Sequence, residues 1–441
     1  MKKTRLPGPR TPPDAICEFS ALWVWRTPFR LVDFAASKSQ ELDYREVGKK
    51  SIRILGALLA VTGASLIWSQ TSPRTEQFEG QEAIVLSNGK LDVTVLPHGS
   101  VLANIALADD PQKLSPLWNP IRLGREAGRG PAQFNGIFGH FPCVDGFGQP
   151  SADERTAGLP QHGEAHGSHF AVTNEPGAVS MRATLPIVQE VFTRIFRMVP
   201  GESVLYVDSQ LENLLGFDRP VNWAEHATVS APFVAPGKTT IALSGSRSQN
   251  RDYTANQQQG RGGGGRGGSQ RRLVPGKDFT WPMAEGLEGS RVDMSVIPDN
   301  PHYTDHAATL MDPSQRLEWV TALNTEKKLV YGYVFRREDY PWIQHWGNFP
   351  SVNALVRGIE FGTQPYDVSR RDVLNAGPLF STPTFRWLPA KSKIESHFIV
   401  FYSRVPEGFG KVDDVRLENG QIVILDNGSN KRAVLAASRG L

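Results

Sequence analysis

The stretch AIVLSNGKLDVTVL, residues 83–96, decides the fold class. Two short runs of aliphatic and β-branched residues flank Asn88-Gly89, a dipeptide that favours the tight turn of a β-hairpin. Similar short runs, bounded by turn residues, occur at 188–198, 203–211, 239–243, 329–335, 359–362, 394–402 and 415–425. Long windows with helical periodicity are scarce, and the sequence contains neither a dinucleotide-binding fingerprint nor a P-loop. The pattern predicts an all-β fold, either a sandwich or a barrel.

Composition narrows the class of protein further. The chain has 441 residues, and its 48 Lys and Arg residues nearly balance 45 Asp and Glu residues, which leaves a formal charge of +3. This balance argues against a nucleic-acid partner, because such binding depends on neutralising phosphates with many basic side chains. Hydrophobic residues make up 39% of the chain, enough for a substantial core. The two cysteines, Cys17 and Cys143, are too few for a disulfide framework.

The first 70 residues differ from the rest. Residues 1–48 are basic, rich in proline and without periodicity, so we expect a poorly structured extension. Residues 49–70 start with two lysines, continue with an apolar run at 54–68 and end in polar residues, which is typical of a signal peptide or membrane anchor. A buried core helix is the alternative. We therefore expect an exported protein, periplasmic or extracellular, with residues 52–68 as a membrane tether if uncleaved, and a folded domain at 71–441.

A biased segment interrupts that domain. Residues 257–272, QQQGRGGGGRGGSQRR, contain almost no apolar side chain, so we expect a flexible surface insertion. Arg-Gly-Gly runs also occur in RNA-binding tails. The near-neutral chain and the position between two strand-rich regions argue against that function here.

Histidines gather between residues 140 and 169. The cluster comprises His140, His162, His166 and His169, with Asp145 and Glu164 close in sequence. Imidazoles and carboxylates in one region indicate either a metal site or a polar cleft for a hydroxylated ligand. The spacing His162-x3-His166-x2-His169 suits metal ligands, but the glycines at 163 and 167 weaken the helix on which such motifs are usually built.

Two later segments favour a polar cleft. Residues 222–233 place Glu225 and His226 next to each other in a strand-like run, so their side chains should point to opposite faces. Residues 356–366 place Glu360 in an apolar run. A buried glutamate must be paired or functional, because stranding its charge costs several kcal/mol. A structural ion pair with an arginine such as Arg370 is the alternative to a functional role for Glu360.

Four features, in this order, make the chain resemble the galactose mutarotase (aldose 1-epimerase) superfamily, in particular its divergent bacterial branches. They are a Gly/Pro/aromatic stretch at 138–148, Leu-Pro-x-His-Gly at 159–163, a strand histidine followed by Pro-Phe at 226–233, and Ile-Glu at 359–360. Leu96-Pro97-His98-Gly99 and Leu117-Trp118-Asn119-Pro120 also resemble early strands of that family. The resemblance covers roughly residues 82–402, and the order and spacing of the motifs carry it.

The resemblance implies a large antiparallel β-sandwich with a sugar cleft on its concave face. It implies that His226 is the general acid on the ring oxygen, that Glu360 is the general base on the anomeric hydroxyl, and that His162 binds the sugar. In such a reaction the ring opens to an aldehyde, the C1 carbonyl turns over, and the ring closes on the other face. The family chemistry requires neither a metal nor an organic cofactor.

Departures from the family pattern bear on the substrate. The residues Asn135-Gly136-Ile137-Phe138 supply no arginine where the sugar-phosphate branch has one ahead of the stretch at 138–148. Glu164-Ala165-His166 follows the His-Gly pair, where that branch has an aromatic residue and Ala-Arg. The missing arginines disfavour a phosphorylated substrate. We therefore expect an unphosphorylated monosaccharide, or the sugar end of a glycan. Beyond His162, the expected substrate-binding residues are Glu164, His166, His140, Asp145, Glu225, Trp346 and Gln364, with Trp346 in a loop at the rim of the cleft as a stacking surface.

Two other functions fit the same residues. A non-catalytic carbohydrate-binding protein of this fold would keep the cleft without turnover. A metal-dependent enzyme would use His140, His162, His166 and His169 as ligands.

Overall fold

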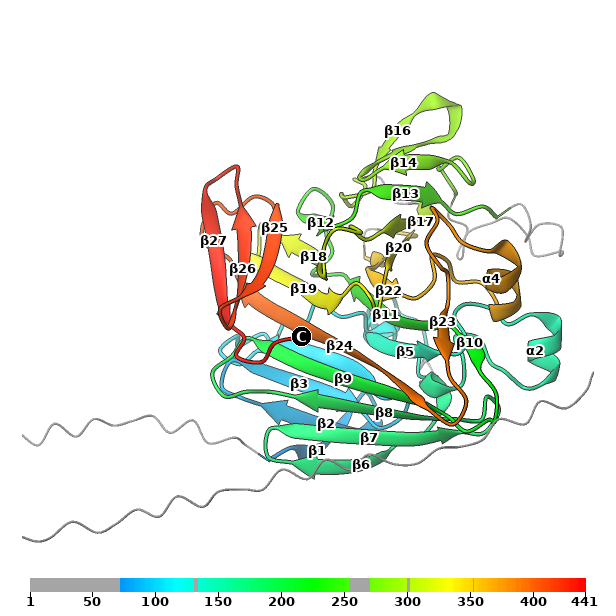
Figure 1. The fold of residues 1–441 in the computed structure, drawn as a ribbon. Coiled ribbons are helices and arrows are strands. Elements are labelled where there is room, and N and C mark those ends of the chain that lie inside the picture. Colours follow the sequence, from blue (N-terminus) through cyan, green and yellow to red (C-terminus); the bar gives the residue numbers. More distant parts are fainter. Residues whose placement is uncertain (1–71, 131–133, 254–269, 300–301, 352) are drawn as a thin grey trace, which may run out of the picture. The chain divides into compact units, whose positions relative to one another are not determined.

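The computed structural model describes residues 72–130, 134–253, 270–299, 302–351 and 353–441 (Figure 1). The predicted extension at 1–48, the signal or anchor at 49–70 and Cys17 lie outside the described residues. Within the described ranges, no helix is long and apolar enough to cross a membrane. The described residues all belong to one compact unit.

The first layer is a 14-stranded sheet. Its strands are β1 Arg74–Phe78, β2 Gln81–Ser87, β3 Leu91–Leu96, β4 Val101–Leu107, β5 His140–Val144, β11 Trp223–Ser230, β13 Arg247–Asn250, β14 Asp278–Thr280, β15 Met283–Glu285, β16 Arg291–Asp293, β17 Tyr303–Leu310, β20 Trp342–Phe349, β21 Val356–Gly358 and β22 Glu360–Gly362. They run in the order β1-β2-β3-β4-β5-β11-β21-β20-β17-β13-β14-β15-β16, with β22 between β11 and β20.

The second layer has eight strands in the order β12-β18-β19-β24-β9-β8-β7-β6, several of which run side by side in Figure 1. Their bounds are β6 Ala171–Glu175, β7 Ala178–Leu185, β8 Glu190–Arg197, β9 Val204–Asn213, β12 Thr239–Leu243, β18 Leu317–Asn324, β19 Leu329–Arg336 and β24 Lys393–Arg404. A short pair joins β10 Arg219–Val221 to β23 Arg386–Leu388. The described helices are short: α1 Pro120–Glu126, α2 Ala152–Thr156 and α4 Arg370–Ala376.

Most of the predicted strands are confirmed. The hairpin of residues 83–96 is β2 and β3, which pair antiparallel with Ile84 opposite Val95. The prediction of one strand at 415–425 is wrong, because Asn419 and Gly420 both have positive φ and turn the chain between β25 Asp414–Glu418 and β26 Gln421–Asp426. With β27 Lys431–Ala436, these strands form a separate three-stranded sheet that packs on the second layer through a small apolar cluster of its own.

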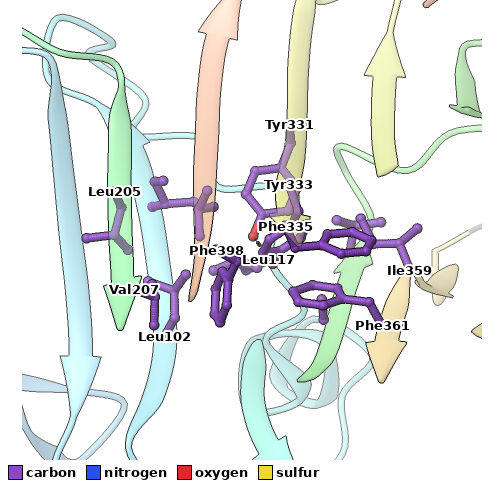
Figure 2. Packing of buried hydrophobic residues seen from close by; sticks show 14 of the residues in the cluster. Leu102, Leu117, Leu205, Val207, Tyr331, Tyr333, Phe335, Ile359, Phe361 and Phe398 are labelled. Carbon is purple, nitrogen blue, oxygen red and sulfur yellow. Dashed lines mark hydrogen bonds between the residues drawn. The ribbon is translucent and has the colours of Figure 1, made fainter. Parts of the chain in front are cut away.

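The main core fills the space between the two large sheets. Phe335 of β19 stacks on Phe361 of β22 at 4.7 Å, and Phe398 of β24 packs edge-on to Phe361 (Figure 2). Every ladder between named strands in the described part of the chain is antiparallel, so the predicted large antiparallel β-sandwich is confirmed. Because side chains alternate along a strand, Phe361 in the core directs the preceding Glu360 to the opposite face of the sheet.

Candidate functional site

Two side chains far apart in sequence, His226 of β11 and Glu360 of β22, meet on the face of the first sheet that points away from the main core. The two strands are neighbours, with Ala224 opposite Gly362. The His226 Nε2 atom lies 3.5 Å from the Glu360 Oε1 atom, and both side chains are almost fully buried. They border a cavity of about 190 Å³. Its lining consists of Trp118, Ile137, Gln161, His162, His226, Tyr253, Arg271, Thr304, His306, Trp346, Asn348, Glu360 and Asp367.

The Glu360 carboxyl group occupies an unusual environment. Burial raises its pKa well above the ordinary value, and the lowering effects of Arg357 and Arg251 do not offset it. Its Oε1 atom has no hydrogen-bond partner among the described residues. The alternative ion pair with Arg370 is wrong, because the Arg370 Nη1 atom lies 2.5 Å from Asp145 instead. A buried carboxyl group with a raised pKa at a cavity is a candidate for proton transfer.

Gly358 of β21 makes room for this carboxyl group. A Cβ atom at position 358 would lie 2.5 Å from the Glu360 Oε1 atom and 3.1 Å from its Cδ atom. Any larger residue would therefore displace the carboxyl group.

The His226 ring is held from two sides. Its Nδ1 atom lies 3.0 Å from the Thr228 hydroxyl oxygen, and its face stacks on Phe141 of β5 with ring centroids 4.4 Å apart. These contacts direct the Nε2 atom toward Glu360. One nitrogen oriented by a neighbour and the other facing a cavity is the usual arrangement of a histidine that transfers protons.

His162 reaches the cavity because of the backbone at the His-Gly pair. His162 and Gly163 both have positive φ, and a Cβ atom at position 163 would lie 2.2 Å from the Val144 carbonyl oxygen. The close approach to β5 thus requires glycine there. The His162 Nδ1 atom accepts a hydrogen bond from the Gly148 N–H at 3.2 Å, and its ring packs edge-on to His226 at 5.1 Å.

Trp346 also lines the cavity, but not in the expected loop. It lies in β20, a strand inside the first sheet, and its ring packs edge-on to Trp118 at 6.4 Å and to His226 at 6.3 Å. The loop prediction is wrong because Trp342–Phe349 pairs with β17 along its whole length despite its polar residues. The two indoles offer an aromatic wall beside the histidine.

Glu225 and His140, both expected to bind the substrate, lie in the interior on the other side of β11. The Glu225 Oε1 atom lies 2.5 Å from the Arg194 Nη2 atom and accepts a hydrogen bond from the Tyr340 hydroxyl at 3.0 Å. Its Oε2 atom lies 2.8 Å from the His140 Nε2 atom. Burial acts to raise the pKa of Glu225, but Arg194 and His140 outweigh it, so the pKa lies below the usual value and the group stays ionised. Side-chain alternation explains why Glu225 faces the interior while His226 faces the cavity.

Four other expected binding residues do not line the cavity either, and we assign them structural roles. Asp145 forms buried ion pairs with Arg219 and Arg370. Glu164 accepts the N–H groups of Ile187 and Val188 at 2.9 and 3.3 Å, and the His166 Nε2 atom lies 2.6 Å from the Gln161 carbonyl oxygen. Gln364 donates to the Tyr366 carbonyl oxygen at 2.6 Å. Each of these groups is therefore engaged by a neighbouring segment of the chain.

The four histidines proposed as metal ligands do not converge. His140 lies in the interior network, His162 lines the cavity, and the exposed His169 lies against His98 with ring centroids 4.5 Å apart. Among the residues that the structure describes, no group of three or more His, Cys, Asp or Glu side chains is placed to hold a metal ion.

Sequence reasoning missed the wall of the cavity formed by β17 and the loop after β13. The His306 Nε2 atom of β17 lies 3.1 Å from the Gln344 Oε1 atom, and its Nδ1 atom lies 3.1 Å from the Tyr253 hydroxyl and 3.4 Å from Asp367. Burial, and to a smaller extent Arg251, holds the pKa of His306 well below its usual value, so the ring is neutral. A single histidine inside a strand-like run carries no signal that would have placed it here.

The end of the predicted insertion belongs to this wall as well. Residues 254–269 lie outside the described part of the chain, but Gln270 bridges to Tyr303, and Arg271 lines the cavity. Arg272 binds the Asp305 carboxylate with contacts of 2.7 to 3.1 Å. The prediction of a flexible surface segment is therefore wrong for residues 270–272, since ion pairing and stacking anchor them.

Comparisons with known proteins bear on the fold. No family model matches the sequence, and no curated protein matches it. Among solved structures, the chain is similar to a galactose mutarotase related enzyme from Lactobacillus acidophilus, with 13% identity, a TM-score of 0.47, and coverage of 76% of this chain and 100% of that one. It is also similar to a galactose mutarotase-like protein from Clostridium acetobutylicum, with 12% identity, a TM-score of 0.48, and coverage of 75% and 98%.

A third solved structure, a galactose mutarotase-like protein from Lactobacillus casei, shows 12% identity and a TM-score of 0.47 over 73% of this chain and 100% of that one. At such identities and TM-scores the likeness carries no argument about the reaction. The reaction must be argued from the cavity itself.

Proposed function

We propose that the chain is an aldose 1-epimerase-like enzyme that interconverts the anomers of an unphosphorylated sugar by general acid–base ring opening. The observation that carries the proposal is the pair of His226 and Glu360, 3.5 Å apart at the edge of one cavity. Anomer exchange needs one group to take a proton at the anomeric hydroxyl and another to give one at the ring oxygen. His226 and Glu360 place two groups that can exchange protons beside one cavity.

His226 and Glu360 together supply and take up every proton that the reaction moves. The Glu360 carboxylate takes the proton from the C1 hydroxyl while His226 gives its Nε2 proton to the ring oxygen, and the C1–O bond of the ring breaks to leave an aldehyde. After rotation about the C1–C2 bond, the C5 hydroxyl attacks the other face of the carbonyl. Its proton returns to His226, and the proton on Glu360 passes to the new C1 hydroxyl.

The surroundings of the pair support this assignment. The volume of about 190 Å³ lies below the ~300 Å³ typical of the smallest drug-sized pockets, which suits a single sugar ring. The His162 ring packs edge-on to His226, and Trp118 and Trp346 provide an aromatic surface for the apolar face of a pyranose.

Anomer exchange by NMR on a panel of neutral aldoses tests the proposal. We expect Glu360→Gln and His226→Ala each to lower kcat by about 10²–10⁴-fold. Glu395→Gln, which changes an exposed glutamate of β24, serves as the matched control and should keep wild-type rates. Equal rates in all four proteins would refute the catalytic roles. Sugar binding by a wild-type protein that does not exchange anomers would replace the proposal with a non-catalytic carbohydrate-binding function.

A further inference from the structure

Arg271 presents a positive charge at the end of the cavity formed by β17 and the loop after β13. Its guanidinium lies over the Tyr253 ring, with the Cζ atom 3.3 Å from the ring centroid, and its side chain lines the cavity. The adjacent Gln270 bridges to Tyr303, the first residue of β17, which fixes the backbone at this point. The Arg271 Nε atom is buried and has no hydrogen-bond partner among the described residues.

The neighbouring arginines are neutralised, but Arg271 is not. Arg251 forms an ion pair with Asp367, and Arg272 forms one with Asp305 at 2.7 Å. In the ranges that the structure describes, no carboxylate lies within 4 Å of the Arg271 guanidinium. A partly buried guanidinium without a carboxylate partner is the kind of group that binds an anion.

This charge lies apart from the acid–base pair. The sheet order β11-β21-β20-β17 places His226 and Glu360 at one side of the cavity, and Arg271 enters from beside β17. Neighbouring strands are about 4.8 Å apart, so a ligand that contacts both groups must extend across the face of the sheet. Thr304 and Asn348 also line the cavity, and their polar side chains suit neutral hydroxyl groups.

We propose that the sugar carries a carboxylate, as hexuronic acids do, and that Arg271 is the residue that selects it. This inference rests on the proposed function, because it names the substrate class of the same cavity. A carboxylate matches one planar guanidinium in charge and geometry. A phosphate dianion would need further cationic partners, whereas Arg251 and Arg272 are already engaged by Asp367 and Asp305.

The experiment compares galacturonate with galactose, and glucuronate with glucose, by calorimetric binding and by NMR anomer exchange. The proteins are the wild type, Arg271→Gln and Arg247→Gln, which removes a positive charge from β13 at a position outside this cavity. We expect the wild type to prefer each uronate about tenfold or more, the strength of a hydrogen bond to a charged group. Arg271→Gln should bring the ratio close to one, while Arg247→Gln should keep it.

The outcomes separate the two proposals. Equal binding of charged and neutral sugars by the wild type, or a uronate preference that survives in Arg271→Gln, would overturn this inference even if Glu360→Gln abolishes anomer exchange. Uronate binding that depends on Arg271 without any anomer exchange would support the recognition of a carboxylate and refute the proposed reaction. Thermal unfolding of Arg271→Gln confirms that the variant is folded.

Discussion

Replacing Gly358 by alanine tests whether the position of one carboxyl group sets the rate. The new Cβ atom would lie 2.5 Å from the Glu360 Oε1 atom, whereas ordinary contacts start at 3.4 Å, so the carboxyl group must move by about 0.9 Å. Misplacement of a catalytic group by about 1 Å can cost about 10²-fold in rate. We therefore expect Gly358→Ala to lower kcat by roughly 10²-fold.

The assay is NMR anomer exchange at saturating sugar, together with thermal unfolding. Two glycine variants serve as controls. Gly216→Ala adds a methyl group where no atom lies within 4 Å, and Gly332→Ala adds one 2.5 Å from Phe401 in the core of another sheet. Gly332→Ala should lose stability but keep the rate of its folded fraction, and Gly216→Ala should change neither. A Gly358→Ala protein with the wild-type rate would refute the claim that Glu360 acts from its observed position.

Three further predictions follow from buried charges and from the N-terminal segment. Burial raises the pKa of Glu360, so the stability that this group contributes is fully present at pH values below the ordinary pKa of a glutamate and is lost as pH rises through the raised pKa. Glu360→Gln should therefore have a higher melting temperature than the wild type, by a margin that grows with pH. A constant margin in thermal unfolding scans would contradict this. Arg194→Met strands the Glu225 carboxylate, which should lower the free energy of unfolding by about 3–5 kcal/mol in urea titrations, and a change below about 1 kcal/mol would refute the structural role of the pair. Deletion of residues 49–70 should keep the protein inside the producing cell in fractionation assays, and unchanged export would rule out a targeting role for that segment.

Local signals in the sequence explain which strands could be predicted. The hairpin of β2 and β3 depends on Asn88-Gly89 and on the flanking apolar residues, all within a few positions of each other. The prediction of one strand at 415–425 was wrong because Asn419-Gly420 forms a two-residue turn within a run whose other residues favour strands.

The site required information that no short stretch contains. Glu360 and His226 could be chosen from motifs, but their contact depends on the pairing of β11 with β22 across more than a hundred residues. The role of Glu225 could not be predicted from its neighbours in sequence, because its burial depends on which face of β11 packs against the core. Arg271 was hidden in a Gly/Arg-rich segment, and only the bridge of Gln270 to Tyr303 brings it to the cavity.

The most direct test of the acid–base pair is a double-mutant comparison of anomer-exchange rates in the wild type, His226→Ala, Glu360→Gln and the double variant. Groups that act as a unit lose their effect together, so we expect the double variant to be no slower than the slower single variant. Losses that multiply in the double variant, or single variants with the wild-type rate, would contradict the assignment of a joint proton relay to His226 and Glu360.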